Sequence, residues 1–280
     1  MKIATWNVNG IRARAAQLHE LVAHEQPDVL CLQEIKAAPS QLAPELCDLE
    51  GYWCYWHGER GYSGVGLHVR KATYAERPVF SHPPFDLENR VVVCQVQSTQ
   101  GPLTVASTYV PNGGKDFPGK LRFLEAMENF AGSFRATGAL LVICGDLNVA
   151  RTDMDVHAKE RKPRAIGQLP EERALIERLL AQGLVDIARK LHPDDAELFT
   201  WWAPWRNLRQ RNIGWRIDYV LASDALGARA RVFESQREFG TSDHAPVVTV
   251  FDWPLPARVD DPQVGRSDAF QQPRTPRLFA

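Results

Sequence analysis

The 280-residue sequence has only five cysteines, and no two of them form a CxxC pair. An odd number of scattered cysteines argues against a disulfide framework or a cysteine-rich zinc site and indicates a reduced, intracellular protein. The N-terminus lacks the basic-then-apolar layout of a signal peptide. No apolar stretch approaches the length of a membrane span. We therefore expect a cytoplasmic protein without a membrane partner.

The sequence also lacks a net charge of either sign, because 33 Lys and Arg residues stand against 34 Asp and Glu residues. Any nucleic-acid site must therefore be a local basic patch. We see no internal repeat and no internal linker. With 44% hydrophobic residues the chain can bury a large core. We predict one domain over residues 1–252 and a C-terminal tail, 253–280, rich in Pro, Arg and Asp.

The most informative stretch is 140–148, Leu-Leu-Val-Ile-Cys-Gly-Asp-Leu-Asn. Its apolar run predicts a strand that is buried on both faces and ends at Gly145. Asp146 and Asn148 follow two residues apart and point the same way, because side chains alternate along a strand. Leaving such groups buried and unpaired is costly. The alternative is an ordinary turn, since Gly, Asp and Asn are common turn residues.

Apolar periodicity predicts the remaining elements. We expect strands at 2–6, 29–32, 52–57, 65–69, 91–96, 103–110, 215–221 and 246–251. We expect helices at 11–25, 41–46, 117–136, 170–182 and 185–190, a turn at 61–64 and a long surface loop at 152–169. Strands that neighbour one another and also alternate with helices indicate a mixed α/β or α+β sandwich.

Polar residues recur where these apolar strands end. They are Asn7, Glu34, Asp146 with Asn148, Asp218, and Asp243 with His244. Any one of them could be a turn or a cap, but burying all of them is costly unless they meet. Carboxylates and amides without cysteine suit Mg²⁺ or Mn²⁺ better than zinc. A histidine beside an acid, with a second acid elsewhere, suggests an oriented imidazole.

Six motifs in order along the chain resemble one known family. They are Gln33-Glu34-Ile35-Lys36, Gly61-Tyr62-Ser63-Gly64-Val65, Tyr109-Val110-Pro111-Asn112, Gly145-Asp146-Leu147-Asn148-Val149-Ala150, Gly214-Trp215-Arg216-Ile217-Asp218-Tyr219 and Ser242-Asp243-His244-Ala245-Pro246. Together they resemble the exonuclease III family of apurinic/apyrimidinic (AP) endonucleases over residues 1–252. The resemblance implies a four-layer sandwich of two packed mixed β-sheets flanked by helices.

The resemblance also implies an activity. It implies Mg²⁺-dependent hydrolysis of the DNA phosphodiester on the 5′ side of an abasic site, with Mn²⁺ able to substitute. A 3′–5′ exonuclease or 3′-end-cleaning activity accompanies it. The expected partner is double-stranded DNA with abasic sites or blocked 3′ ends, and nothing in the sequence suggests a dimer, so we expect a monomer.

The resemblance assigns metal-binding roles to the first strand ends. Glu34 is the main metal ligand that it implies, with Asn7 beside it. Asp243 resembles a second acidic group around the metal. Asn9 stands where some members of the family have Asp, so a second metal position is weaker here.

The resemblance assigns the chemical step to the later strand ends. Asp146 resembles the group that aligns or deprotonates the attacking water, and Asn148 supports it. His244 resembles the residue that contacts the scissile phosphate, oriented by Asp218. Phosphodiester hydrolysis requires a placed water and donors aimed at the phosphate oxygens, which these residue types supply. Which carboxylate is the formal base stays open.

The resemblance also points to residues that contact DNA. Tyr109 and Asn112 resemble contacts to the phosphate or the leaving group. Trp201, Trp215 and Ile217 would form an apolar slot for a flipped sugar that lacks its base. The alternative is that these three are core residues, as buried aromatics usually are.

A local basic patch is the expected DNA surface. It combines phosphate-pairing charge with stacking surface, from Arg206, Arg209, Arg211, Trp201, Trp202 and Trp205, with Lys36, Lys115 and Lys120 as possible additions. The basic loop 151–164 is either a second DNA contact or a solvated face. Competing functions are a nonspecific nuclease, a phosphatase of inositol lipids or sphingolipids on the same fold, and a DNA-binding protein that has lost catalysis.

Overall fold

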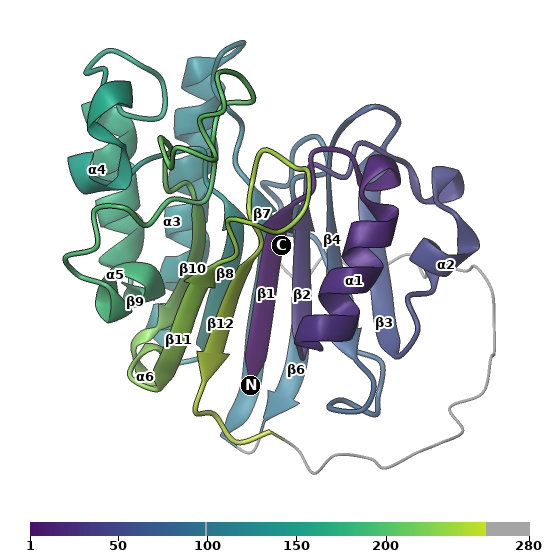
Figure 1. Ribbon diagram of the computed structural model, residues 1–280. Helices are drawn as coiled ribbons and strands as arrows, with labels where there is room; N and C mark the ends of the chain where they lie inside the picture. The colour runs from purple at the N-terminus through teal and green to yellow at the C-terminus, as the bar shows by residue number, and fades with distance from the viewer. Residues whose placement is uncertain (99, 256–280) are drawn as a thin grey trace.

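The computed structural model describes residues 1–98 and 100–255. The described strands form two six-stranded sheets that pack face to face, with helices on their outer sides (Figure 1). The predicted four-layer sandwich is confirmed. No helix within the described ranges has the length and apolar character needed to cross a bilayer.

The first sheet mixes parallel and antiparallel pairs. Its strands, in spatial order, are β11 (Ala230–Ser235), β12 (Val247–Phe251), β1 (Lys2–Asn7), β2 (Val29–Gln33), β4 (Tyr62–Arg70) and β3 (Tyr52–Glu59). The second sheet is also mixed. Its strands are β5 (Val79–Ser81), β6 (Val91–Ser98), β7 (Gly101–Tyr109), β8 (Leu140–Asp146), β10 (Asp218–Ser223) and β9 (Leu184–Asp186).

Helices cover the outer face of each sheet, so the apolar side chains form three layers. The α-helices are α1 (Ala15–Glu25), α2 (Pro44–Cys47), α3 (Phe117–Thr137), α4 (Pro170–Leu180), α5 (Ile187–Leu191) and α6 (Asp224–Gly227). Leu18 of α1 packs with Leu30 on the outside of the first sheet. Leu124 of α3 packs with Leu141 on the outside of the second sheet. Cys144 lies in the central layer between the sheets.

Several expected boundaries were wrong because tertiary contacts override local pattern. The expected turn at 61–64 is mostly strand, since β4 begins at Tyr62. The strand expected from residue 215 begins at Asp218, because Trp215 forms only isolated bridges to Val156 and Trp201. The helix expected at 185–190 is preceded by strand β9 and begins at Ile187.

Other differences are short elements that carry weak sequence signals. Strands β5 and β11 were not expected, and β11 exposes Arg231 and Val232 instead of alternating cleanly. The helix expected at 11–25 begins as a 3-10 turn, Ile11–Ala13, before α1. The loop expected at 152–169 holds two 3-10 turns, Asp153–Asp155 and Ala158–Glu160.

The start of the predicted tail packs on the body of the protein. Trp253 is buried, and the guanidinium of Arg229 lies 5.3 Å from its ring centroid. The rest of that predicted segment, 256–280, lies outside the described residues.

Strand register brings the polar strand ends to one edge of the sandwich. In the second sheet Asp146 is paired with Tyr109 on parallel β7 and with Asp218 on antiparallel β10. Residues paired directly across a sheet project to the same face. Asp146 shares the parity of Cys144, which lies between the sheets, so these three side chains face the first sheet. In that sheet Asn7 has the parity of Ile3 and faces back toward them.

Candidate active site

The site begins with a hydrogen bond that joins the two sheets. Asn7 at the end of β1 donates from Nδ2 to Oδ2 of Asp146 at the end of β8, at 2.9 Å. Both side chains are buried. One rung deeper, Gln33 donates to Ser107 at 3.1 Å and accepts from Thr5 at 3.2 Å. A polar layer therefore separates the apolar core from the site, and the sequence analysis missed it.

Asp146 is held by its neighbour as well. The backbone N–H of Asn148 donates to Asp146 Oδ1 at 2.9 Å, and the Asn148 amide donates to Asp146 Oδ2 at 3.3 Å. Asn148 has φ of 52°, a left-handed conformation that Asn adopts more readily than most residues. The structure thus places Asn148 where the sequence predicted, in direct support of Asp146.

His244 lies beside Asp146 and is oriented by Asp218. Nδ1 of His244 is 2.9 Å from Oδ2 of Asp218, and Nε2 is 3.8 Å from Oδ2 of Asp146. The second distance is too long for a hydrogen bond. The backbone N–H groups of Ile217 and Asp218 both donate to the hydroxyl oxygen of Thr200, which fixes the start of β10. His244 therefore has one nitrogen committed to Asp218, and its other nitrogen points toward Asp146.

Burial and mutual charge shift the pKa values of this pair. Burial raises the pKa of the Asp146 carboxyl, and the nearby Asp218 adds to that rise, while His244 opposes it. Burial lowers the pKa of His244, but the negative charges of Asp218 and Asp146 outweigh it and leave the pKa raised. The pKa values of Asp146 and His244 are therefore both raised, by burial at the acid and by the neighbouring negative charges at the histidine.

A buried ion pair supports the loops that carry Asn148 and Asn112. Lys120 of α3 is fully buried and pairs with Glu172 in the first turn of α4. Its ammonium also donates to the carbonyl oxygens of Asn148, at 2.7 Å, and Asn112, at 3.2 Å. Asn112 in turn donates from Nδ2 to Oδ1 of Asn148 at 3.3 Å. Lys120 is therefore a support for the site, and its predicted place in an exposed DNA-binding patch was wrong.

Glu34 follows β2 and has a strained backbone. Its φ is 55°, and its carboxylate lies 2.7 Å from the ammonium of Lys36. Lys36 also donates to Oδ1 of Asn9 at 2.6 Å. Left-handed non-glycine residues cluster at functional sites. The bridging position of Lys36 was not identified from sequence, although its motif was.

Asp243 is anchored at both carboxylate oxygens. Asn9 donates from Nδ2 to Oδ1 at 2.8 Å, and Trp201 donates from its indole nitrogen to Oδ2 at 3.0 Å. Burial would raise the pKa of Asp243, but the neighbouring His244 and these two hydrogen bonds outweigh burial and leave the pKa lowered. Asp243 therefore ties the acidic cluster to the aromatic residues beside it.

Tyr109 closes the cluster at the end of β7. Burial raises the pKa of its hydroxyl, and the nearby carboxylates of Glu34 and Asp146 raise it further. The guanidinium of Arg90 lies 4.7 Å from the Tyr109 ring centroid. Tyr109 therefore remains a neutral hydroxyl, able to donate a hydrogen bond beside both acids.

The predicted apolar slot is assembled next to His244. The rings of Trp201 and Trp215 meet edge to face with centroids 5.6 Å apart, and Trp201 lies 6.3 Å from the His244 ring. Ile217 packs in the same small cluster, together with Ala150 and Val156. The indole nitrogen of Trp215 is buried without a hydrogen-bond partner among the described residues, which is unusual for a purely structural tryptophan.

A buried charge network holds this aromatic segment in place. Arg216 is fully buried and donates to Asp155 at 2.7 Å and to Asp186 at 3.0 and 2.8 Å. Arg189 joins at Asp155. Burial would raise the pKa of Asp155, but the guanidinium groups of Arg216 and Arg189 outweigh burial and hold the pKa of Asp155 at about 2. Removing one partner of such a buried network typically lowers the free energy of unfolding by about 3–5 kcal/mol. Because Arg216 lies between Trp215 and Asp218, the network fixes the backbone of this segment.

The predicted basic patch is only partly exposed. Arg206 and Trp205 are exposed, with Trp205 at 59%. Trp202 is buried, and Arg209 donates to the carbonyl oxygens of Arg237, Ser242 and Phe239. The prediction that Trp202 and Arg209 face DNA was wrong, because both hold the segment before Asp243 in place.

The basic loop 151–164 is also partly tied to the protein. Arg151 pairs with Glu177, and Arg161 donates to the carbonyl oxygens of Asp153 and Val156. Lys159 and Arg164 are exposed. The exposed part of the loop leaves the DNA-contact alternative open.

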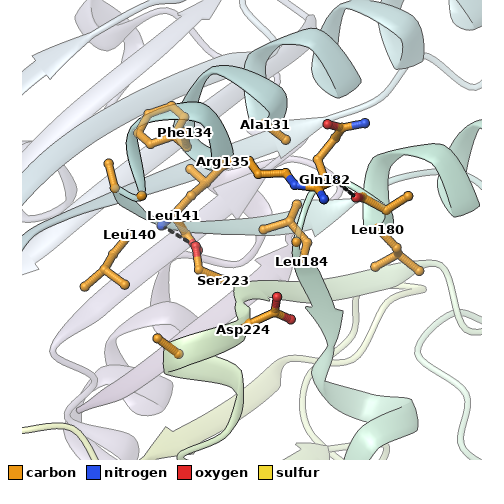
Figure 2. A pocket seen from close by; sticks show the side chains of 15 residues that line it. Ala131, Phe134, Arg135, Leu140, Leu141, Leu180, Gln182, Leu184, Ser223 and Asp224 are labelled. Atoms are coloured by element: carbon orange, nitrogen blue, oxygen red, sulfur yellow. Dashed lines mark hydrogen bonds between the residues drawn. The ribbon is translucent and has the colours of Figure 1, made fainter.

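One hollow in the described structure lies elsewhere. It has a volume of about 420 Å³ and is lined by Phe134 of α3, Leu180 of α4, Leu184 and the start of β8 at Leu140 (Figure 2). Asp146 stands at the other end of β8. At about 3.3 Å per residue the two ends are about 20 Å apart. The hollow is therefore separate from the candidate active site.

The fold and the strand-end cluster match one family of known proteins. The model of the endonuclease/exonuclease/phosphatase family matches residues 4–244. The chain therefore belongs to this family, and its members depend on a metal ion. The expected enzyme class, a nuclease-type hydrolase, is confirmed.

Individual relatives identify the branch of the family. Exodeoxyribonuclease III of Haemophilus influenzae is 32% identical over 266 residues, which cover 90% of this chain and 100% of that protein. DNA repair nuclease APEX1 of Danio rerio is 33% identical, covering 88% of this chain and 81% of that protein. Recombination repair protein 1 of Drosophila melanogaster is 33% identical; the match covers 90% of this chain but only 37% of that longer protein. The resemblance to the exonuclease III family is confirmed.

Solved structures give the same result. The 3′–5′ exonuclease NExo from Neisseria meningitidis superposes with a TM-score of 0.81 at 32% identity, covering 90% of this chain and 100% of that one. NExo is also described as a 3′ phosphatase, in a structure bound to a product DNA hairpin. An AP endonuclease from Archaeoglobus fulgidus has a TM-score of 0.77 at 29% identity, covering 90% of this chain and 99% of that one.

The donors at the strand ends fit a hard metal ion. They are carboxylate and amide oxygens on buried or half-buried residues, contributed by Asn7, Glu34, Asp146, Asp218 and Asp243. One of these oxygens, Oδ1 of Asp218, is buried without a hydrogen-bond partner among the described residues. Oxygen donors of this kind suit Mg²⁺, so the residues present agree with the metal dependence of the family.

Proposed function

We propose that this protein is a Mg²⁺-dependent DNA repair nuclease that hydrolyses the phosphodiester on the 5′ side of abasic sites. Mn²⁺ can replace Mg²⁺, and the same site removes nucleotides or blocking groups from 3′ ends. One observation carries the proposal: the cluster of Asn7, Asp146, Asp218 and His244 lies directly beside the Trp201–Trp215 pair. Phosphodiester chemistry and an apolar slot thus share one site.

The metal ion would be held by Glu34 and Asn7. Asp243 lies nearby, and the hydrogen bond from Asn9 restrains its carboxylate. When bound, the ion would neutralise charge on the scissile phosphate. Lys36, which pairs with Glu34, limits the negative charge of this side of the site.

The chain's own residues would carry out the proton and phosphate chemistry. Asp146, whose pKa burial raises, holds the attacking water and accepts its proton. Asn148 fixes the Asp146 carboxylate, and Asp218 orients His244 so that Nε2 meets a phosphate oxygen. Tyr109 donates its hydroxyl to the phosphate or leaving group.

DNA binding would use the surface around this cluster. Trp201, Trp215 and Ile217 receive the flipped abasic sugar, which lacks the base that an intact nucleotide would have to fit. Asn112 lies one hydrogen bond from Asn148 and contacts the DNA backbone. Arg206, exposed next to Trp205, pairs with phosphate. We further propose that residues 1–252 act as one domain and that the protein works as a cytoplasmic monomer.

The substrate assignment is tested by comparing duplexes that differ at one position. We expect Mg²⁺-dependent nicking of a duplex with one synthetic abasic site to far outpace nicking of the matched intact duplex. A third duplex with a 3′-phosphate tests end cleaning. Equal rates on the abasic and intact duplexes would favour a nonspecific nuclease, and binding without cleavage of any duplex would favour a DNA-binding protein that has lost catalysis.

Trp215→Ala is expected to weaken the preference for abasic DNA by about tenfold, the scale of one lost apolar pocket contact. The exonuclease rate on intact 3′ ends should change less, because that reaction does not need the slot. Trp205→Ala is the matched control, since Trp205 is exposed and should affect both substrates by the same factor. An unchanged preference in Trp215→Ala would remove Trp215 from the pocket.

A further inference from the structure

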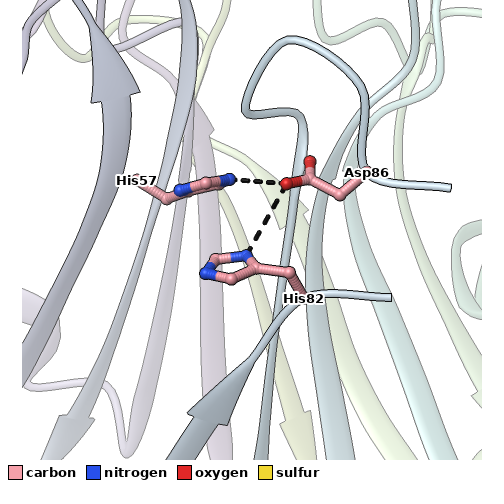
Figure 3. Close-up of side chains that lie close together, drawn as sticks. All are labelled: His57, His82 and Asp86. Atoms are coloured by element: carbon pink, nitrogen blue, oxygen red, sulfur yellow. Dashed lines mark hydrogen bonds and ion pairs between the residues drawn. The ribbon is translucent and has the colours of Figure 1, made fainter. Parts of the chain in front are cut away.

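A second cluster of metal-binding side chains lies outside the candidate active site. His57, His82 and Asp86 each offer a ligand atom, and these atoms lie within 4.8 Å of one another (Figure 3). The rings of the two histidines are tilted by 31° to one another, with centroids 3.8 Å apart. We propose that this cluster binds a zinc ion that joins the edges of the two sheets.

The spacing of the ligand atoms suits a small tetrahedral ion. Nε2 of His57 is 2.6 Å from Oδ2 of Asp86, and Nδ1 of His82 is 3.7 Å from the same oxygen. Ligand atoms around a tetrahedral zinc lie about 3.3 Å apart, given bond lengths near 2.0–2.1 Å. Side-chain shifts of less than about 1 Å would therefore bring these three atoms to zinc-binding distances.

Hydrogen bonds from neighbouring residues orient Asp86 and hold the ring of His82 beside it. Oδ1 of Asp86 accepts the backbone N–H groups of Arg90, at 2.7 Å, and Val91, at 2.8 Å, which leaves Oδ2 facing the histidines. Nδ1 of His82 is 3.0 Å from the carbonyl oxygen of Val91, and a metal ion at Nδ1 would replace that hydrogen bond. Nε2 of His82 is 2.8 Å from the Tyr55 hydroxyl, whose oxygen can accept a hydrogen bond from Nε2 when Nδ1 binds metal. Such outer hydrogen bonds fix the orientation of metal-bound histidines and carboxylates.

Charge also favours a cation here. Within residues 1–98 and 100–255, the only basic groups within ion-pair distance of Asp86 are the two imidazoles. The nearby Arg90 side chain is committed to Glu88 and to the Tyr62 hydroxyl. The three ligand side chains are half-buried, with exposures of 20%, 23% and 10%, so a water molecule could take the fourth position.

The choice of zinc follows from the ligand types. Two imidazoles and one carboxylate suit Zn²⁺, Co²⁺ or Ni²⁺, whereas Mg²⁺ prefers oxygen ligands alone. The candidate active site has the opposite character, with several oxygens and one histidine. The histidine cluster should therefore prefer zinc, and the candidate active site should prefer magnesium.

The position of the cluster gives the ion a structural role. His57 lies on β3, the edge strand of the first sheet, and His82 directly follows β5, the edge strand of the second. An ion held by both would link the edge strands of the two sheets. Asp86 also fixes the backbone of Arg90, whose guanidinium packs on Tyr109 of the candidate active site.

The test uses the full chain after removal of metal by a chelator, in buffer with saturating Mg²⁺ to fill the oxygen-rich site. We expect Zn²⁺ to bind at one equivalent and to raise the melting temperature by about 5 °C or more at a hundredfold excess over its Kd. Co²⁺ should give the visible absorption of a tetrahedral site with nitrogen ligands. The absence of both signals from the wild-type protein would overturn the proposal without affecting the proposed nuclease function.

Variants locate the binding. His57→Ala and Asp86→Asn should lose the zinc-dependent rise in melting temperature and the cobalt absorption. Asp86→Asn preserves the shape of the side chain and the oxygen that accepts from Arg90 and Val91, so it covers the case in which His57→Ala does not fold. His24→Ala, which replaces an 81% exposed histidine on α1, is the matched control and should keep both signals. Full retention of both signals in Asp86→Asn would show that the ion binds elsewhere.

Discussion

Replacing Asp146 by asparagine is expected to reduce the turnover of abasic-site hydrolysis by at least about a hundredfold, the scale for one positioned catalytic group. The carboxylate accepts hydrogen bonds from Asn7 and Asn148, so its place is set by both sheets. Asparagine keeps the size of the side chain but is a far weaker base. Single-turnover nicking of an abasic duplex at saturating Mg²⁺ measures the loss.

The matched control is Asp194→Asn, which changes an exposed aspartate far along the chain and should leave the rate unchanged. Asp146→Asn should also keep its affinity for abasic DNA, because Asp146 acts on the water rather than on the sugar. A rate within a factor of about three of wild type, well below the effect of losing a positioned group, would remove Asp146 from the chemical step.

The second large effect is expected for His244→Ala, again at least about a hundredfold in turnover. Nε2 of His244 faces the site while Nδ1 is held by Asp218 at 2.9 Å, so the alanine variant loses the proposed phosphate donor. Asp218→Asn should show a smaller loss in kcat with little change in KM, because the histidine remains but is no longer fixed in one tautomer.

Single-turnover rates of His244→Ala, Asp218→Asn and the double variant show whether Asp218 contacts the substrate or only positions His244. The double variant should be little worse than His244→Ala alone, since Asp218 acts through the histidine. Independent, multiplying losses would contradict that relation and place Asp218 in contact with the metal ion or the substrate.

The strand-end residues could be predicted because their chemistry conflicts with their surroundings. Asp146 and Asn148 follow five apolar residues, and Asn7 ends another buried strand. Such polar groups are costly to bury unless they meet, and the register of β7, β8 and β10 brings them to one edge. The apolar strand pattern and the polar residues at the strand ends therefore suffice to predict which of these residues meet in the site.

The supporting residues could not be predicted because their partners are distant in the sequence. Lys120 looks like a surface helix residue, yet Glu172 and the carbonyl of Asn148 surround it. Arg209 looks like a DNA contact, yet it binds carbonyl oxygens of residues 237–242. Single-sequence patterns report burial along one element and carry no record of such pairings.

The backbone conformation of the site could not be predicted from the sequence either. Glu34 and Asn148 both have positive φ values, 55° and 52°, although neither position holds glycine. Hydrogen bonds from distant residues hold these conformations, such as the one from the N–H of Gly10 to the carbonyl oxygen of Glu34 at 2.8 Å. Strained positions of this kind follow from the assembled fold.

The most direct test of the proposed nuclease site is to map its cuts on a labelled duplex with one abasic site at a known position. Fragments are resolved to single nucleotides, with Mg²⁺ and with a chelator. We predict one dominant cut, at the phosphodiester on the 5′ side of the abasic site, that requires the metal and is lost in Asp146→Asn. Cuts spread along both strands, or cutting that persists in the chelator, would contradict the account.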